Sequence, residues 1–154
     1  MTNQGPDHVL ALLGYAMDGL RRELVPRMQR EAPPGSNALR PSQVRLLSLT
    51  PREGMRVTDL ADRLGMTKQS LGELATALER DGMLESVRDP ADGRVRILRP
   101  TAAGLVAVAG AERVIAEVEA EWRTRVGPDR WDQLRDILGD VARLPLSSEG
   151  HSAS

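Results

Sequence analysis

The sequence contains no cysteine and only two histidines, and these gaps exclude several kinds of chemistry. Without cysteine there can be no disulfide, no thiolate nucleophile and none of the usual structural zinc sites. His8 and His151 lie near opposite ends of the chain, and neither a nucleophile–base pair nor a phosphate-binding glycine loop can be assembled. We therefore expect no enzymatic activity, no metal and no cofactor, and a function based on binding.

Aromatic residues and long apolar runs are also scarce. The chain has no phenylalanine, one tyrosine and two tryptophans, so its core must be built from aliphatic residues, which suits close-packed helices. No apolar run approaches the roughly 18 residues that a membrane span needs, and residues 1–7 lack the basic and apolar regions of a signal peptide. We expect a cytoplasmic protein that folds as one compact unit.

Charge is unevenly distributed, although the net charge is only −1. Residues 20–56 hold eight arginines against three acids, whereas residues 100–154 hold six arginines against nine acids. Residues 57–99 are near neutral, with seven basic and eight acidic residues. Because nucleic-acid binders usually present a basic surface, this central segment counts mildly against nucleic-acid binding.

Periodic apolar residues predict two helices in the first third of the chain. Residues 7–31 carry apolar side chains at three- and four-residue steps, as in an amphipathic helix, and Pro26 should kink or interrupt it. Residues 33–37 are rich in proline and glycine and predict a break. Ser42 is then placed to cap a second helix, which residues 51–54 end.

The last third of the chain predicts two more helices. One begins at Pro100 and ends near residue 126, and the other covers residues 129–144. Trp122 and Trp131 are better interpreted as core or dimer-interface anchors than as ligand platforms. Because the terminal helices carry apolar stripes that a small central core cannot bury, we expect them to pair with a second copy of the chain.

The centre of the chain has the spacing of a helix-turn-helix. Thr58 is placed to cap a helix over residues 59–64, Gly65 can supply a left-handed turn, and Thr67 can cap a third helix that runs to about Arg80. The apolar residues that would form the seam between these helices are Leu60, Ala61, Leu64, Met66, Leu71, Leu74 and Leu78. Any two helices packed around a glycine turn can show this pattern, so alone it leaves DNA binding open.

A predicted β-hairpin follows this motif directly. Residues 84–88 and 95–99 are short β-branched runs, and the Asp92-Gly93 pair between them favours a tight turn. Strand alternation would place Arg94 and Arg96 on one face of the hairpin. An arginine at the tip of such a ribbon can enter the minor groove of DNA, so the hairpin favours DNA binding. Asp92 is equally explained by turn chemistry alone.

Several motifs together resemble the MarR family of winged-helix regulators, over a region from Val9 to Leu144. The motifs are Val57-Thr58-Asp59-Leu60-Ala61, Leu78-Glu79-Arg80-Asp81-Gly82-Met83-Leu84, Asp89-Pro90-Ala91-Asp92-Gly93-Arg94 and Thr101-Ala102-Ala103-Gly104. The resemblance implies that residues 67–80 are a recognition helix in the major groove. It also implies that the hairpin of residues 84–99 is the wing, which Asp92 braces and from which Arg94 probes the minor groove. Finally, it implies repression that a small ligand relieves.

We predict a DNA interface on the outer face of the recognition helix and on the wing. Its candidate residues are Thr67, Lys68, Gln69, Ser70, Glu73, Thr76, Arg88, Asp92, Arg94 and Arg96. Each of these polar side chains could instead simply be solvated.

Three residues depart from this pattern. Ser86 stands where the family often has arginine after a glutamate, and Pro100 stands where it usually has leucine before the threonine. Gly72 lies inside the recognition helix, where glycine costs about 1 kcal/mol relative to alanine. Either close approach to a DNA duplex or internal packing would explain a glycine there.

The predicted fold class is α+β and mostly helical. Residues 1–35 would form an N-terminal dimerisation helix, 36–100 a winged helix-turn-helix core, 101–146 C-terminal dimerisation helices and 147–154 a flexible tail. As a homodimer, the protein would bind a pseudo-palindromic operator in double-stranded DNA as a repressor. The alternative is a winged-helix protein-interaction module without DNA binding, which the near-neutral centre favours.

A small, partly apolar or anionic ligand is a further expected partner. Besides the family resemblance, this expectation rests on arginines that would border a crevice beside the first helix, namely Arg21, Arg22, Arg27, Arg30, Arg40 and Arg45. These arginines could equally be solvated or contact phosphates. Because the chain has no cysteine, release of DNA by thiol oxidation is excluded.

Overall fold

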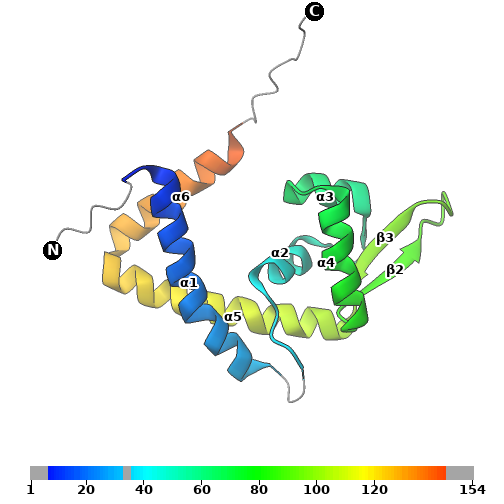
Figure 1. Ribbon diagram of the computed structural model, residues 1–154, viewed down its shortest axis with the longest axis horizontal. Helices are drawn as coiled ribbons and strands as arrows, with labels where there is room; N and C mark the ends of the chain where they lie inside the picture. Colours follow the sequence, from blue (N-terminus) through cyan, green and yellow to red (C-terminus); the bar gives the residue numbers. More distant parts are fainter. Residues whose placement is uncertain (1–6, 33–35, 145–154) are drawn as a thin grey trace, which may run out of the picture. The chain divides into compact units, whose positions relative to one another are not determined.

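The computed structural model describes residues 7–32 and 36–144, and this part of the chain is mostly helical (Figure 1). The elements in chain order are α1 (Val9–Glu31), α2 (Pro41–Leu49), β1 (Met55–Arg56), α3 (Val57–Leu64), α4 (Lys68–Arg80), β2 (Leu84–Arg88), β3 (Arg96–Pro100), α5 (Ala102–Val126) and α6 (Pro128–Arg143). The predicted α+β class is therefore confirmed. Part of the predicted break, residues 33–35, and the predicted tail lie outside the described residues. Within the described ranges, no helix combines the length and apolar character that a membrane span requires.

The chain divides into two compact units, one up to Ala116 and the other from Glu117 onward. Sequence analysis predicted a single unit, and the difference arises from α5, which contributes residues to both. This helix has 25 residues and is therefore about 38 Å long, more than a small core can cover.

The core of the first unit is built by α2, α3, α4 and β3. Its fully buried large side chains are Leu46, Leu47, Leu60, Leu71, Leu78 and Leu98. Gly65 has a φ of 63° and ends α3 in the left-handed conformation, so the predicted helix-turn-helix geometry is confirmed. Leu74, expected in the seam, is only half-buried.

A three-stranded antiparallel sheet completes the first unit, with strand order β1-β3-β2. The hairpin pairs Leu84 with Pro100 at its base and Arg88 with Arg96 at its outer end. Figure 1 shows β2 and β3 side by side. Strand β3 begins one residue later than predicted. Strand β1 was not predicted, because a two-residue strand has no periodicity to detect.

Two helices begin earlier than their predicted caps. Helix α2 begins at Pro41, since proline suits the first helical position, and Ser42 therefore lies inside it. Helix α3 begins at Val57, directly after β1, so Thr58 also lies within a helix. Helix α1 continues through Pro26, where the sequence predicted a kink or an interruption, so this proline does not interrupt the helix.

The junction between the wing and α5 explains the Thr-x-x-Gly motif. The Thr101 hydroxyl accepts a hydrogen bond from the Gly104 N–H (3.0 Å) and donates one to the Gly82 carbonyl (2.6 Å). A Cβ built on Gly104 would lie 2.0 Å from the carbonyl oxygen of Met83. The motif thus caps α5 and lets its first turn pack directly against the backbone after α4.

In the second unit, Trp122 and Trp131 pack edge to face, with ring centroids 6.2 Å apart and an angle of 75° between their planes. Trp131 is buried, and beside this pair Arg123 forms two hydrogen bonds with Asp132 (3.0 and 2.8 Å). Both tryptophans therefore anchor packing, in agreement with the sequence-based interpretation.

Candidate nucleic-acid interface

The first turn of α4 is fixed by its cap. The Thr67 hydroxyl accepts a hydrogen bond from the Ser70 N–H (3.1 Å) and also donates one to the Ser70 hydroxyl (3.0 Å). This confirms the predicted capping role of Thr67. Two of the side chains predicted to contact DNA, those of Thr67 and Ser70, thus also hold the start of the helix.

The outer face of α4 is polar and exposed, as predicted. It presents Lys68, Gln69, Ser70, Glu73 and Thr76. The Thr76 hydroxyl donates to the Gly72 carbonyl (2.8 Å), so it is turned back onto its own helix. The remaining side chains include donors and acceptors that suit base edges, such as the amide of Gln69 and the carboxylate of Glu73.

The tip of the wing is held by short hydrogen-bonded turns. Asp92 accepts a hydrogen bond from the Arg94 N–H (3.0 Å), and Arg88 Nη1 donates to the Gly93 carbonyl (2.8 Å). The Arg94 guanidinium is exposed and contacts no partner within the described residues. Because Arg94 lies in the loop before β3, the predicted strand alternation with Arg96 does not extend to it.

A second brace at the base of the wing loop was missed by sequence analysis. The buried Asp89 carboxylate accepts hydrogen bonds from Arg56 Nε (3.1 Å) and Nη2 (2.7 Å) and from the Ala91 N–H (2.9 Å). The Ala91 N–H first, and the Arg56 guanidinium second, hold the pKa of Asp89 below its ordinary value of 3.8. Asp89 is therefore charged at neutral pH, and the brace is lost only as the pH falls through that lowered pKa. Asp89 begins one of the motifs that resemble the MarR family, but nothing in the sequence identified Arg56 as its partner.

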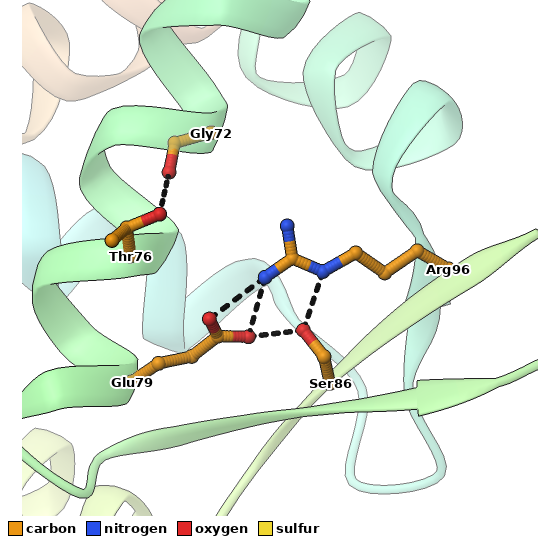
Figure 2. A network of polar contacts seen from close by, with 5 residues as sticks. All are labelled: Gly72, Thr76, Glu79, Ser86 and Arg96. Atoms are coloured by element: carbon orange, nitrogen blue, oxygen red, sulfur yellow. Dashed lines mark hydrogen bonds and ion pairs between the residues drawn. The ribbon is translucent and has the colours of Figure 1, made fainter.

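Arg96 joins the wing to α4 (Figure 2). Its Nη2 lies 2.7 Å from both carboxylate oxygens of Glu79, and its Nε donates to the Ser86 hydroxyl (2.5 Å), which itself donates to Glu79. Arg96 was predicted as a DNA contact, and the structure engages two of its three nitrogens within the chain. Ser86 on β2 thus bridges the two residues, since its hydroxyl contacts both Arg96 and Glu79.

Two cavities of similar size lie in the first unit. One, of about 470 Å³, is lined by polar groups that include Arg40, Gln43 and Arg80. The other, of about 460 Å³, is mostly apolar and is lined by residues such as Met28, Val106, Ala111 and Arg113. The arginines predicted to border a ligand crevice do not line the apolar cavity among its described residues, and Arg40 lines the polar one instead. No cluster of three potential metal ligands occurs in the described part of the chain.

Comparison with known proteins relates this geometry to a family. Residues 39–95, from the end of the α1–α2 connection to the wing loop, match the profile of the MarR family. No curated protein sequence matches the chain.

Solved structures extend the similarity beyond that segment. The PcaV transcriptional regulator from Streptomyces coelicolor, determined with its natural ligand, is 26% identical with a TM-score of 0.69, covering 90% of this chain and 92% of that chain. Sco3205, a MarR family transcriptional regulator from S. coelicolor in complex with DNA, is 24% identical with a TM-score of 0.70 and 97% coverage of both chains. S. aureus MepR in a DNA complex is 16% identical with a TM-score of 0.73, covering 89% of this chain and 98% of that one. The profile match covers the helix-turn-helix and the wing tip, and the similar folds cover most of the chain, so residues 39–95 are similar to the MarR family and the chain has the winged helix-turn-helix fold of these regulators.

Proposed function

We propose that the protein represses transcription as a homodimer that binds a pseudo-palindromic operator, with α4 in the major groove and the wing in the minor groove. The observation that carries the proposal is the pairing of an exposed polar face on α4 with a braced wing whose tip presents the free Arg94 guanidinium. Sco3205 and MepR, which share the fold, were both solved with DNA. A dimer would present two recognition helices to successive major grooves, which matches the two-fold symmetry of such an operator.

Exposed apolar side chains on the terminal helices support the dimer. On α1 they include Val9, Leu10, Leu12, Leu13, Tyr15 and Met17, and on α6 they include Leu134, Ile137, Leu138 and Val141. Soluble monomers rarely leave contiguous apolar stripes in water, so these faces suit contact with a second copy of the chain.

The separate roles proposed for α4 and the wing give the first test. We expect Arg94→Ala to weaken operator binding by about 1–3 kcal/mol without changing the fold, because it removes a positive charge from the minor groove. Gln69→Ala should in addition relax the preference at one or two base pairs. Both effects are measurable by fluorescence anisotropy on the operator, once genome-wide mapping of bound DNA has identified it, and on operators with single base-pair changes.

Arg143→Ala is the matched control, since Arg143 is exposed, pairs with Asp140 on the same helix and lies on α6. Operator affinity of Arg94→Ala equal to that of the control would contradict the wing assignment. A parent protein whose DNA affinity is absent or independent of salt would instead favour the alternative of a protein-interaction module.

We further propose that a small aromatic acid binds the apolar cavity of the first unit and releases the DNA. Met28 of α1 and Val106, Ala107 and Val114 of α5 provide an apolar wall, and Arg113 provides a cation for a carboxylate. For release, the ligand must bind the free protein more tightly than the DNA complex.

Thermal unfolding with benzoate, salicylate and the uncharged benzamide tests the ligand. The two acids should raise the Tm and weaken DNA binding, because they bind the folded, DNA-free state. Benzamide has no carboxylate for Arg113, so both effects should be smaller with it. Ala107→Leu, which fills the cavity, should abolish both responses. A Tm that none of these compounds changes, or ligand binding that leaves DNA affinity unchanged, would contradict the proposal.

A further inference from the structure

Gly72 in the middle of α4 has no explanation within the described part of the chain. A Cβ built on it meets no heavy atom within 4 Å, and its φ is not in the left-handed region. Neither packing nor backbone conformation therefore requires glycine, although glycine weakens a helix relative to alanine. Of the two explanations that the sequence left open, internal packing is removed.

Gly72 lies on the side of α4 that faces the wing. Gly72, Thr76 and Glu79 follow each other at steps of four and three residues, so they share one face of the helix. Figure 2 shows these residues on the side of α4 toward Arg96, with Glu79 reaching the guanidinium. Gly72 is half-buried, a Cβ there would enter open space, and the Thr76 hydroxyl is turned back to the Gly72 carbonyl, so the helix backbone is partly exposed at this point.

Arg96 presents a free donor to the same region. Its Nε and Nη2 are engaged by Ser86 and Glu79, while its Nη1 has no hydrogen bond in the described part of the chain. In Figure 2 this nitrogen points away from both partners. The ion pair with Glu79 therefore fixes the guanidinium while one edge stays available.

The geometry of DNA indicates what would occupy the space between α4 and the wing. If α4 enters a major groove and the wing enters the neighbouring minor groove, the strand that separates the two grooves must pass between them. We propose that this sugar-phosphate strand is bound at Gly72, Thr76 and Arg96: the missing side chain lets the strand approach the backbone of α4, and Arg96 Nη1 donates to a phosphate. This inference rests on the proposed function.

A glycine pair separates the effect on DNA from the effect on the fold. Gly72→Ala should raise the Tm by about 2–4 °C through helix propensity, yet weaken binding to a mixed-sequence duplex of about 30 base pairs by about tenfold or more. Gly110→Ala on α5 is the control, since its Cβ would meet only the flexible end of Arg113 at 3.8 Å. It should raise the Tm similarly and leave DNA affinity unchanged. Unchanged DNA affinity in Gly72→Ala overturns the inference, whereas a parent that binds no DNA overturns the proposed function.

A second pair separates phosphate binding by Arg96 from a purely structural role. Each phosphate contact contributes about 0.9 to the slope of log K against log salt concentration, so Arg96→Gln should reduce the slope by nearly 2 in a dimer. Glu79→Gln keeps the arginine and removes a nearby negative charge, so it should leave the slope and affinity unchanged or increase them. Equal losses of affinity in both variants, with no change in slope, would mean that Arg96 only holds the wing and would overturn its assignment as a phosphate contact.

Discussion

Gly104→Ala should destabilise the fold by about 3 kcal/mol, near the upper end of the range for overpacking. The added methyl group would lie 2.0 Å from the carbonyl oxygen of Met83, which is backbone and cannot move aside as a flexible side chain could. That carbonyl also accepts the hydrogen bond from the Thr101 N–H (3.1 Å), so relieving the clash would disturb the start of α5. Urea unfolding followed by circular dichroism measures the loss, which corresponds to a fall in Tm of about 10 °C.

Gly110→Ala provides the opposite expectation on the same helix. Its added Cβ has room, so the substitution should stabilise the protein by up to about 1 kcal/mol through helix propensity. If Gly104→Ala were as stable as Gly110→Ala, the close approach of α5 to the backbone at Met83 would be wrong. The two variants differ only in which turn of α5 receives the methyl group.

The parts of the fold that the sequence predicted are those set by local patterns. The left-handed turn at Gly65 follows from the absence of a Cβ, and the wing follows from Asp92-Gly93 between two β-branched runs. The predicted start of β3 and the predicted caps of α2 and α3 were displaced by one or two residues. A proline at the first helical position set the start of α2, and pairing with another strand set the starts of α3 and β3. Neither effect is visible in the pattern of capping side chains.

The parts of the site that the sequence did not predict depend on contacts between distant residues. Arg56 pairs with Asp89 across 33 positions, and Arg96 pairs with Glu79 across 17. Periodicity shows that Arg96 is exposed but not that it turns toward α4, because the direction of a long side chain depends on which partner the fold brings near. The open space beside Gly72 likewise needed the structure, since the sequence does not show whether an alanine would fit there.

The proposed homodimer leads to the largest expected effect on function. Ile137 and Val141 lie one turn apart on α6 with exposed fractions of 51% and 57%. In a dimer interface, a carboxylate at both positions would be buried without a partner, which costs more than the apolar contact it replaces. We therefore expect the double substitution Ile137→Glu and Val141→Glu to give a folded monomer.

Loss of the dimer should reduce operator affinity by about a thousandfold. A monomer occupies one half-site, so it forfeits the gain that comes from binding the second half-site as part of the same molecule.

Gly139→Glu is the matched control, because it adds a carboxylate to the opposite face of α6, where Arg143 is near. Sedimentation at micromolar concentration, together with anisotropy on a full operator and on a single half-site, measures both consequences. The control should remain dimeric and bind the full operator normally, while the double variant should bind the full operator no better than the half-site. A double variant that still sediments as a dimer would show that α6 does not form the interface, and a monomer that retains full operator affinity would show that DNA recognition does not depend on two linked half-sites.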